Sequence, residues 1–169
     1  MQYPKNRIKI PFLLVILITV VVCACREPDV NEDKKEKIGQ KYDCMSIDDC
    51  LAQYKFTAAR AHLDAINDPR NRWEPNKKIV NIETSYWVNQ GDFNQAMTVL
   101  EEARASIVTN YTRESDYNKM RYNLISSIVN KLLDKGNYKE AKRWALKIDY
   151  DKKREELLKQ IKDTEKVMN

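Results

Sequence analysis

Glycine and histidine are scarce in this chain, and each shortage excludes a class of site. The 169 residues include three Gly and one His. Gly39, Gly91 and Gly136 lie far apart, whereas a phosphate-binding loop needs several glycines clustered at one turn. A single His62 without an orienting partner does not support a Ser-His-Asp triad, and no further ligands cluster near it in the sequence to hold a metal. We therefore expect no enzymatic activity, no cofactor and no metal ion.

Proline is also scarce, with five residues in all, while Lys, Glu, Ala and Leu are abundant. This composition is typical of an all-α domain, because these residues favour helices and few helix breakers interrupt them. Carboxylates are plentiful, but pairs such as Glu101-Glu102 and Glu155-Glu156 stand among Lys and Arg. We interpret such pairs as solvated helix faces rather than as acid/base pairs.

The first 25 residues have the composition of an export signal. Lys5, Arg7 and Lys9 form a basic start, residues 10–22 are almost unbroken apolar sequence, and charged sequence follows residue 25. A basic region, a short apolar region and a small residue before the cut are typical of secretory signals. The apolar core of about 13 residues is short for a spanning helix, which needs roughly 20. An uncleaved anchor remains an alternative, as does an ordinary signal cut near Ala24.

Residues 22–25 read Val-Cys-Ala-Cys. This end of the signal resembles the lipobox of bacterial lipoproteins, in which a branched residue and a small residue precede an invariant Cys. Val22 and Ala24 occupy those two places. The resemblance implies that Cys25 is lipidated on its sulfur and becomes the new N-terminus. Cys23 is the alternative, but Val22 before it is a poor small residue.

The mature chain would begin with a flexible tether. Residues 1–24 hold three cations and no acids, so the formal charge falls from +5 to +2 on their removal, and we expect no binding to nucleic acid. Residues 25–42 are charged and nearly devoid of apolar side chains. Such a segment buries too little surface to offset its ordering entropy. Its acidic cluster also resembles surface-export signals of some outer-membrane lipoproteins.

Cys23 would leave with the signal peptide and Cys25 would carry the lipid, so Cys44 and Cys50 are the two remaining cysteines. Six residues apart on one continuous helix, they would be too far apart to bridge. However, Ser46 with Asp49 is typical of a helix start, so that Cys44 would precede the helix and fold over onto Cys50. The two are a candidate disulfide in an oxidising compartment, with two buried thiols as the alternative.

Three later segments share one pattern, beginning at Phe56, Phe93 and Tyr138. In each, Ala follows the aromatic residue at +3, and apolar residues follow at +7 and +10. These offsets lie on one stripe of a helix. A Gly-Asp or Gly-Asn pair precedes the second and third aromatic residue, which favours a tight turn between helices, because Gly takes positive φ and Asx caps the next helix.

These segments resemble the tetratricopeptide repeat (TPR) family, in which Gly-[Asp/Asn]-[Tyr/Phe] marks the turn between helix A and helix B. The resemblance covers roughly residues 43–148 and implies stacked antiparallel hairpins. The aromatic residues are 37 and 45 positions apart instead of about 34, and the first segment lacks the Gly. The extra residues fall near 68–76 and 110–116, where we expect loops. A closing helix is expected over residues 152–168.

Two polar strips follow from the same resemblance, because partner-contacting residues of the family lie on helix A. Counted back from Gly91 and Gly136, the strips comprise Asn81, Ser85 and Asn89, and Asn123, Ser127 and Asn130. Asn side chains offer both donors and acceptors, which suits the backbone of an extended peptide. The alternative is a solvated helix face.

Exposed tryptophan gives a second functional hypothesis, because aromatic rings stack on sugars. Trp87 and Trp144 lie on apolar stripes, whereas Trp73 stands between Pro69 and Pro75 and is expected in a loop. A glycan-binding surface lipoprotein is therefore an alternative function, and a structural envelope component is another.

The sequence thus predicts three parts: a signal peptide at 1–24, a lipidated Cys and tether at 25–42, and an all-α TPR-like solenoid of six to seven helices at 43–169. We expect a cell-envelope lipoprotein, anchored in the outer membrane through its lipid. Its expected role is to bind a protein or peptide partner.

Overall fold

The structure is a computed structural model, and it describes residues 32–107 and 114–168. Within these ranges the chain forms eight α-helices and one 3-10 helix and no β-strand, which confirms the predicted all-α class. The elements are α1 (Glu32–Tyr42), α2 (Ile47–Ala52), α3 (Phe56–Asp64), η2 (Pro69–Arg72), α4 (Trp73–Gln90), α5 (Phe93–Ile107), α6 (Glu114–Leu133), α7 (Tyr138–Ala145) and α8 (Asp151–Met168). The predicted signal peptide and Cys25 lie outside the described residues.

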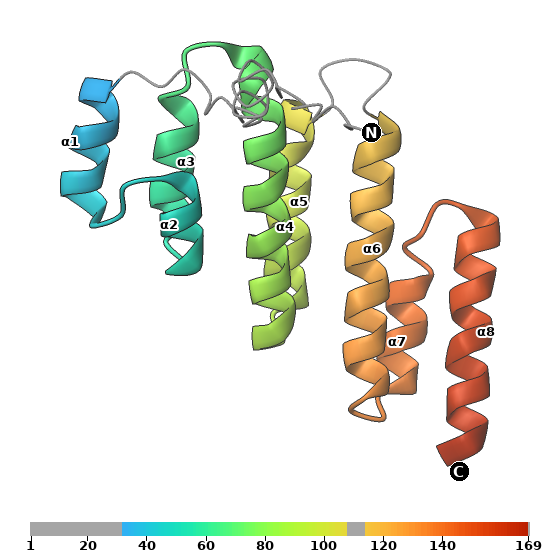
Figure 1. Cartoon of the computed structure of the whole chain (residues 1–169). Helices are drawn as coiled ribbons and strands as arrows, with labels where there is room; N and C mark the ends of the chain where they lie inside the picture. Colours follow the sequence, from blue (N-terminus) through green and yellow to red (C-terminus); the bar gives the residue numbers. More distant parts are fainter. Residues whose placement is uncertain (1–31, 108–113, 169) are drawn as a thin grey trace, which may run out of the picture.

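The helices from α2 onward pack as consecutive hairpins. Helix α2 packs against α3, α4 against α5, and α6 against α7, while α8 packs against α7 and α6 (Figure 1). Helices α4, α6 and α8 run in the same direction, and α4 also contacts α6. The α4–α5 and α6–α7 turns lie at one end of the molecule, and the α3–α4 and α7–α8 connections lie at the other (Figure 1).

The hairpin turns at Gly91 and Gly136 share one hydrogen-bonded motif. Gly91 has φ 82°, and the N–H of the next residue, Asp92, donates to the carbonyl oxygen of Trp87 at 2.9 Å. Gly136 has φ 68° and is followed by the same pattern of bonds. This is the Schellman motif, which requires a left-handed residue after the helix. The predicted role of these two glycines is confirmed.

The Asx residue after each glycine caps the next helix. The Asp92 carboxylate accepts a hydrogen bond from the Gln95 N–H at 2.9 Å, at the start of α5. The Asn137 side chain accepts one from the Glu140 N–H at 3.3 Å, at the start of α7. Each Gly-Asx pair therefore ends one helix and begins another, as the sequence predicts.

The first hairpin makes the same turn with a tyrosine in place of glycine. Tyr54 has φ 56°, and the N–H of Lys55 donates to the carbonyl of Cys50 at 2.9 Å. A left-handed conformation costs a residue with a side chain roughly 1–2 kcal/mol. The only sign of this turn in the sequence is the position of Tyr54, which corresponds to Gly91 and Gly136.

The three alanines of the predicted repeat pattern are fully buried in the hairpins. Ala59, Ala96 and Ala141 are each 0% exposed. They lie in two apolar clusters, one among α2, α3 and α4 and one spanning α4 to α8. Helix α4 joins both, because Ile79 belongs to the first and Val80 to the second. The helix stripes predicted from the repeat pattern therefore form the core.

The predicted tether is partly wrong, because residues 32–42 form helix α1. Gly39 is buried against Met45, Tyr42 packs against the α2–α3 cluster, and Lys55 Nζ donates to the Asp43 carbonyl at 3.1 Å. The segment itself has few apolar side chains to offset its ordering entropy. Packing against α3 supplies the missing stabilisation. Residues 25–31 lie outside the described part of the chain.

The loop predicted over 68–76 is also shorter than expected, because η2 occupies Pro69–Arg72 and α4 begins at Trp73. Asp68 caps η2 by accepting from the Arg70 N–H at 2.9 Å. Most of the second predicted loop, 110–116, lies outside the described residues, and α6 begins at Glu114. The predicted closing helix is present as α8, with Leu157 and Ile161 buried.

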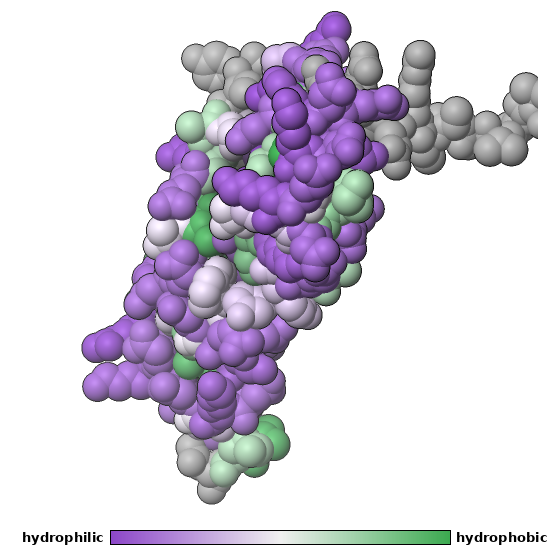
Figure 2. All heavy atoms as spheres, turned by 90° about the vertical axis from the view of Figure 1, so that its left-hand side faces the viewer, coloured by the Kyte–Doolittle hydropathy of each residue, from purple (hydrophilic) through white to green (hydrophobic). Residues whose placement is uncertain are grey.

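The surface seen from the α1 side is dominated by hydrophilic residues, with small hydrophobic patches between them (Figure 2). Among the helices that the structure describes, none combines the length and the apolar character needed to cross a membrane.

Candidate binding groove

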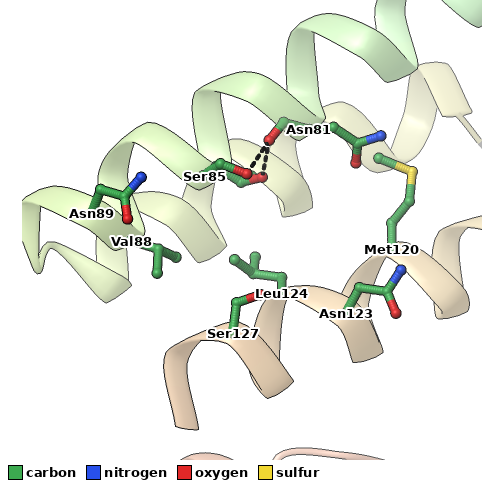
Figure 3. A pocket seen from close by; sticks show the side chains of 9 residues that line it. Asn81, Ser85, Val88, Asn89, Met120, Asn123, Leu124 and Ser127 are labelled. Atoms are coloured by element: carbon green, nitrogen blue, oxygen red, sulfur yellow. Dashed lines mark hydrogen bonds between the residues drawn. The ribbon is translucent and has the colours of Figure 1, made fainter. Parts of the chain in front are cut away.

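A groove lies between α4 and α6, on the side of these helices that carries the two predicted polar strips (Figure 3). Its volume is about 390 Å³. We call it the α4–α6 groove, and it is lined by Asn81, Thr84, Ser85, Val88 and Asn89 of α4 and by Met120, Asn123, Leu124 and Ser127 of α6.

Five of the six predicted strip residues line this groove. On α4 they recur every four residues, at Asn81, Ser85 and Asn89, so they follow one face of the helix. On α6, Asn123 and Ser127 recur in the same way. All five are exposed. The contact between α4 and α6 therefore brings together two strips that the sequence predicted separately.

The floor of the groove is apolar. Val88 and Leu124 project from facing helices into the space between them (Figure 3), and they are 5% and 6% exposed. Met120 adds a flexible thioether beside Asn81. An apolar floor between polar rims suits a ligand that places an apolar side chain inward and its backbone against the rims.

The amide groups of the rim have unused hydrogen-bonding capacity. Ser85 Oγ and Thr84 Oγ1 donate to the Asn81 carbonyl at 2.7 and 3.1 Å, so their protons are engaged within α4 (Figure 3). The side-chain amides of Asn81, Asn89 and Asn123 form no hydrogen bond with any other described residue. Each presents two donors and an acceptor to whatever occupies the groove.

Asn130 is the predicted strip residue that the groove does not include. Its side-chain oxygen accepts a hydrogen bond from Gln160 Nε2 of α8 at 3.0 Å. The sequence places Asn130 on the correct face of α6, but near the end of that helix the neighbour is α8. Asn130 therefore connects two helices in this structure.

A second hollow adjoins the groove at the α2–α3 turn. It has a volume of about 280 Å³ and is lined by Tyr54, Ile82, Ser85, Tyr86, Asn89 and Gln90. We call it the Tyr54 hollow. Ser85 and Asn89 line both depressions, so the two adjoin at these residues of α4. Tyr54 was not predicted as a site residue, although its alignment with the two turn glycines is visible in the sequence.

Neither lining contains an Asp, Glu, Lys, Arg or His, although charged residues make up 33% of the chain. A third hollow, between α6 and the start of α8, is different. Its lining includes Glu114, Lys119, Arg121, Asp149 and Lys153. The absence of charge is therefore a property of the α4–α6 groove and the Tyr54 hollow, rather than of the surface in general.

The perturbed carboxylate of α4 is Glu83, which lines neither depression. Burial raises the pKa of Glu83 above its ordinary value, and the Arg60 guanidinium of α3 opposes that rise. The two side chains form an ion pair with an exposure of 38% for Arg60 and 11% for Glu83. This pair connects the first hairpin to the second. Neither Arg60 nor Glu83 lines any of the three hollows described in this section.

Cys44 and Cys50 are joined by a disulfide, with their Cα atoms 5.2 Å apart. Ser46 caps α2 by accepting from the Asp49 N–H at 3.1 Å, and the Asp49 carboxylate accepts from the Met45 N–H at 2.8 Å. The helix start therefore lies between the two cysteines, which is the arrangement that lets Cys44 reach Cys50.

His62 is buried beside this disulfide, and its Nε2 lies 3.0 Å from the Cys44 carbonyl oxygen. His62 is therefore a buried packing residue of α3. The ligand atoms of Cys44, Cys50 and His62 lie within 4.8 Å of one another. However, both sulfur atoms are used in the disulfide, which leaves no thiolate for a metal.

The tryptophans do not form an exposed sugar-binding surface. Trp73 opens α4, is half-buried and packs against the core, so its expected loop position is wrong. Trp144 is 4% exposed, and Trp87 also packs against the core. Among the described residues, the large exposed aromatic side chains are those of Tyr54 and Tyr150, at 59% and 73%.

Comparisons with family models, with curated proteins and with solved structures found no match to this chain.

Proposed function

We propose that this protein is a lipid-anchored scaffold of the cell envelope that binds a partner protein or peptide in the α4–α6 groove. The observation that carries the proposal is the groove itself, with amide groups on both rims and an apolar floor. Such a surface recognises a polypeptide without chemical change. The protein would act by presenting this preformed surface at a membrane.

The arrangement of hairpins supports a TPR-like solenoid as the scaffold. Helices α4 and α6 take the place of helix A, and α5 and α7 take the place of helix B, with Gly-Asx turns between them. In the TPR family, partner-contacting residues lie on helix A, and the groove is lined by α4 and α6. Helix α8 then caps the end, with two inward apolar residues and a charged outer face.

The membrane location rests on the sequence of the signal. Val22 and Ala24 precede Cys25 as in a lipobox, and an oxidising compartment suits the Cys44–Cys50 disulfide. We propose the outer membrane as the location. The lipid would hold the hairpins close to other envelope proteins.

An affinity capture from detergent-solubilised native envelopes tests the scaffold. The bait is the lipidated protein, compared with a groove variant that carries Asn81→Ala, Asn89→Ala and Asn123→Ala. The matched control carries Asn71→Ala, Asn94→Ala and Asn118→Ala, three exposed asparagines outside the groove.

The proposal predicts a protein that is captured by the wild type and the control and lost from the groove variant. Capture of the same proteins by all three baits would show that the strips are only a solvated face. Equal thermal unfolding of the three baits is required, since exposed Asn to Ala changes have small effects on stability.

A further inference from the structure

Tyr54 occupies a turn position whose left-handed backbone conformation favours glycine. Its φ is 56°, and the corresponding residues of the other two hairpins are Gly91 and Gly136. Its side chain is 59% exposed, so the free energy gained by burying the ring offsets only part of the conformational cost. Residues held in such conformations cluster at binding sites, where the side chain has a use outside the fold.

The ring of Tyr54 belongs to an ordered aromatic surface. Its centroid lies 5.1 Å from that of Tyr86 and 6.2 Å from that of Phe56. Tyr86 is held in turn by edge contacts with Phe56 at 5.5 Å and with Trp87 at 5.0 Å. Because its neighbours fix Tyr86, the hollow presents a preorganised aromatic face beside the α4–α6 groove.

The charge of the linings restricts the ligand. Neither lining contains an Asp, Glu, Lys, Arg or His. A charged side chain, a free terminus or a phosphate would therefore lose hydration in these depressions and meet no opposite charge. The amides of Asn81, Asn89 and Asn123 suit uncharged peptide groups. The lining thus favours an internal, uncharged segment of polypeptide.

Resting on the proposed function, we propose that the α4–α6 groove and the Tyr54 hollow form one site for an extended, uncharged peptide segment. A proline or aromatic side chain of that segment packs on Tyr54 and Tyr86. The Asn rims hold its backbone. Proline-containing extended segments dock in aromatic-lined grooves because their conformation is already ordered.

Selection from a displayed library of random ten-residue segments tests this site. The full-length chain in detergent is the bait, and the Asn81→Ala, Asn89→Ala, Asn123→Ala variant removes background binders. We expect the enriched segments to lack Asp, Glu, Lys and Arg at their shared positions and to contain proline or an aromatic residue. The consensus is then synthesised with both ends blocked, and its affinity is measured by fluorescence anisotropy.

Tyr54→Gly is the decisive variant. It replaces the strained residue with the one found at the other two turns, so we expect it to fold at least as stably as the wild type. Affinity for the consensus peptide should fall about tenfold or more, as for other buried aromatic contacts at interfaces. Tyr150→Gly, at an exposed tyrosine of the third hollow, should leave the affinity unchanged.

Other outcomes separate this inference from the proposed function. Charged consensus segments, or segments bound equally by the Tyr54→Gly variant, would overturn the inference and leave the scaffold in place. If no segment binds the wild type better than the groove variant, both fail. Binding of neutral oligosaccharides such as chitotetraose, lost with Tyr54→Gly, would overturn the peptide and assign the site to a glycan.

Discussion

At the residue scale, a substitution at Gly136 measures the free-energy cost of a left-handed backbone conformation without a steric clash. Its φ is 68°, and a Cβ added there would meet nothing within 4 Å. Gly136→Ala should therefore destabilise the protein by about 1 kcal/mol through conformation alone. Urea unfolding measures this loss. Gly136→Asn should lose less, because Asn tolerates left-handed φ, and an unchanged Ala variant would contradict the expectation.

The ion pair of Arg60 and Glu83 predicts a pH dependence. Arg60→Met leaves an ionised, buried Glu83 without its cation, which should cost about 1–3 kcal/mol near pH 7. Burial raises the pKa of the Glu83 carboxyl above its value in the unfolded chain. Glu83 therefore takes up a proton at a higher pH in the folded state than in the unfolded state. The loss should therefore shrink as the pH falls through that raised pKa, since neutral Glu83 needs no cation.

Urea unfolding of the Arg60→Met variant at several pH values checks this sign. The control measures the same change in a Glu83→Gln background, which lacks the titrating group. In that background the effect of Arg60→Met on the free energy of unfolding should no longer depend on pH. A loss that grows toward low pH would contradict the argument.

Residue identity explains which site residues could be predicted. The strips at Asn81, Ser85 and Asn89 follow from helical spacing, which the sequence displays directly. The pairing of Asn130 with Gln160 does not, because spacing gives the face of a helix but not its neighbour. Tyr54 was missed for a different reason, since tyrosine itself disfavours the left-handed conformation that the turn imposes.

At the scale of elements, the short helix α2 depends on its covalent link. Six residues are too few for a helix to persist alone. The Cys44–Cys50 disulfide closes a loop with a sequence separation of 6, so reduction should lower stability by about 2 kcal/mol in the loop-entropy model. The measurement is thermal unfolding with and without dithiothreitol.

A variant with Cys44→Ala and Cys50→Ala provides the control for this prediction. It should unfold near the reduced wild type and should not respond to dithiothreitol. If reduction leaves the wild-type transition unchanged, the packing of α2 against α3 is sufficient without the disulfide.

The arrangement of the helices also explains why the hairpins are regular although the repeat pattern recurs at unequal intervals in the sequence. The aromatic residues that open α3, α5 and α7 are 37 and 45 positions apart. The tight Gly-Asx turns leave no room for extra residues, whereas the α3–α4 connection, which contains η2, lies at the opposite end (Figure 1). Helix α1 was not predictable in the same way, because its stability comes from packing on α3 rather than from its own apolar pattern.

At the scale of the whole molecule, attachment to the membrane should depend on one residue. In the proposed lipoprotein, Cys25→Ser removes the acceptor of the lipid, and the protein should move from the membrane fraction to the aqueous phase. Each acyl chain adds membrane affinity through its buried methylenes. Labelling with a palmitate analogue, followed by detergent phase separation, measures both changes.

Cys23→Ser provides the matched control, because it changes the neighbouring cysteine and leaves the acceptor. It should keep both the label and the membrane location. If the Cys25→Ser variant keeps the label and the Cys23→Ser variant loses it, Cys23 is the lipidated residue. If the wild type itself takes up no label, the protein is not a lipoprotein.

The uncharged lining of the α4–α6 groove has a consequence for the conditions in which the protein works. Attraction between formal charges weakens as salt shortens the Debye length, from about 10 Å at 0.1 M to about 3 Å at 1 M. A site without formal charges has no such attraction to lose. Its occupancy would therefore stay nearly constant while the ionic strength around the cell rises and falls.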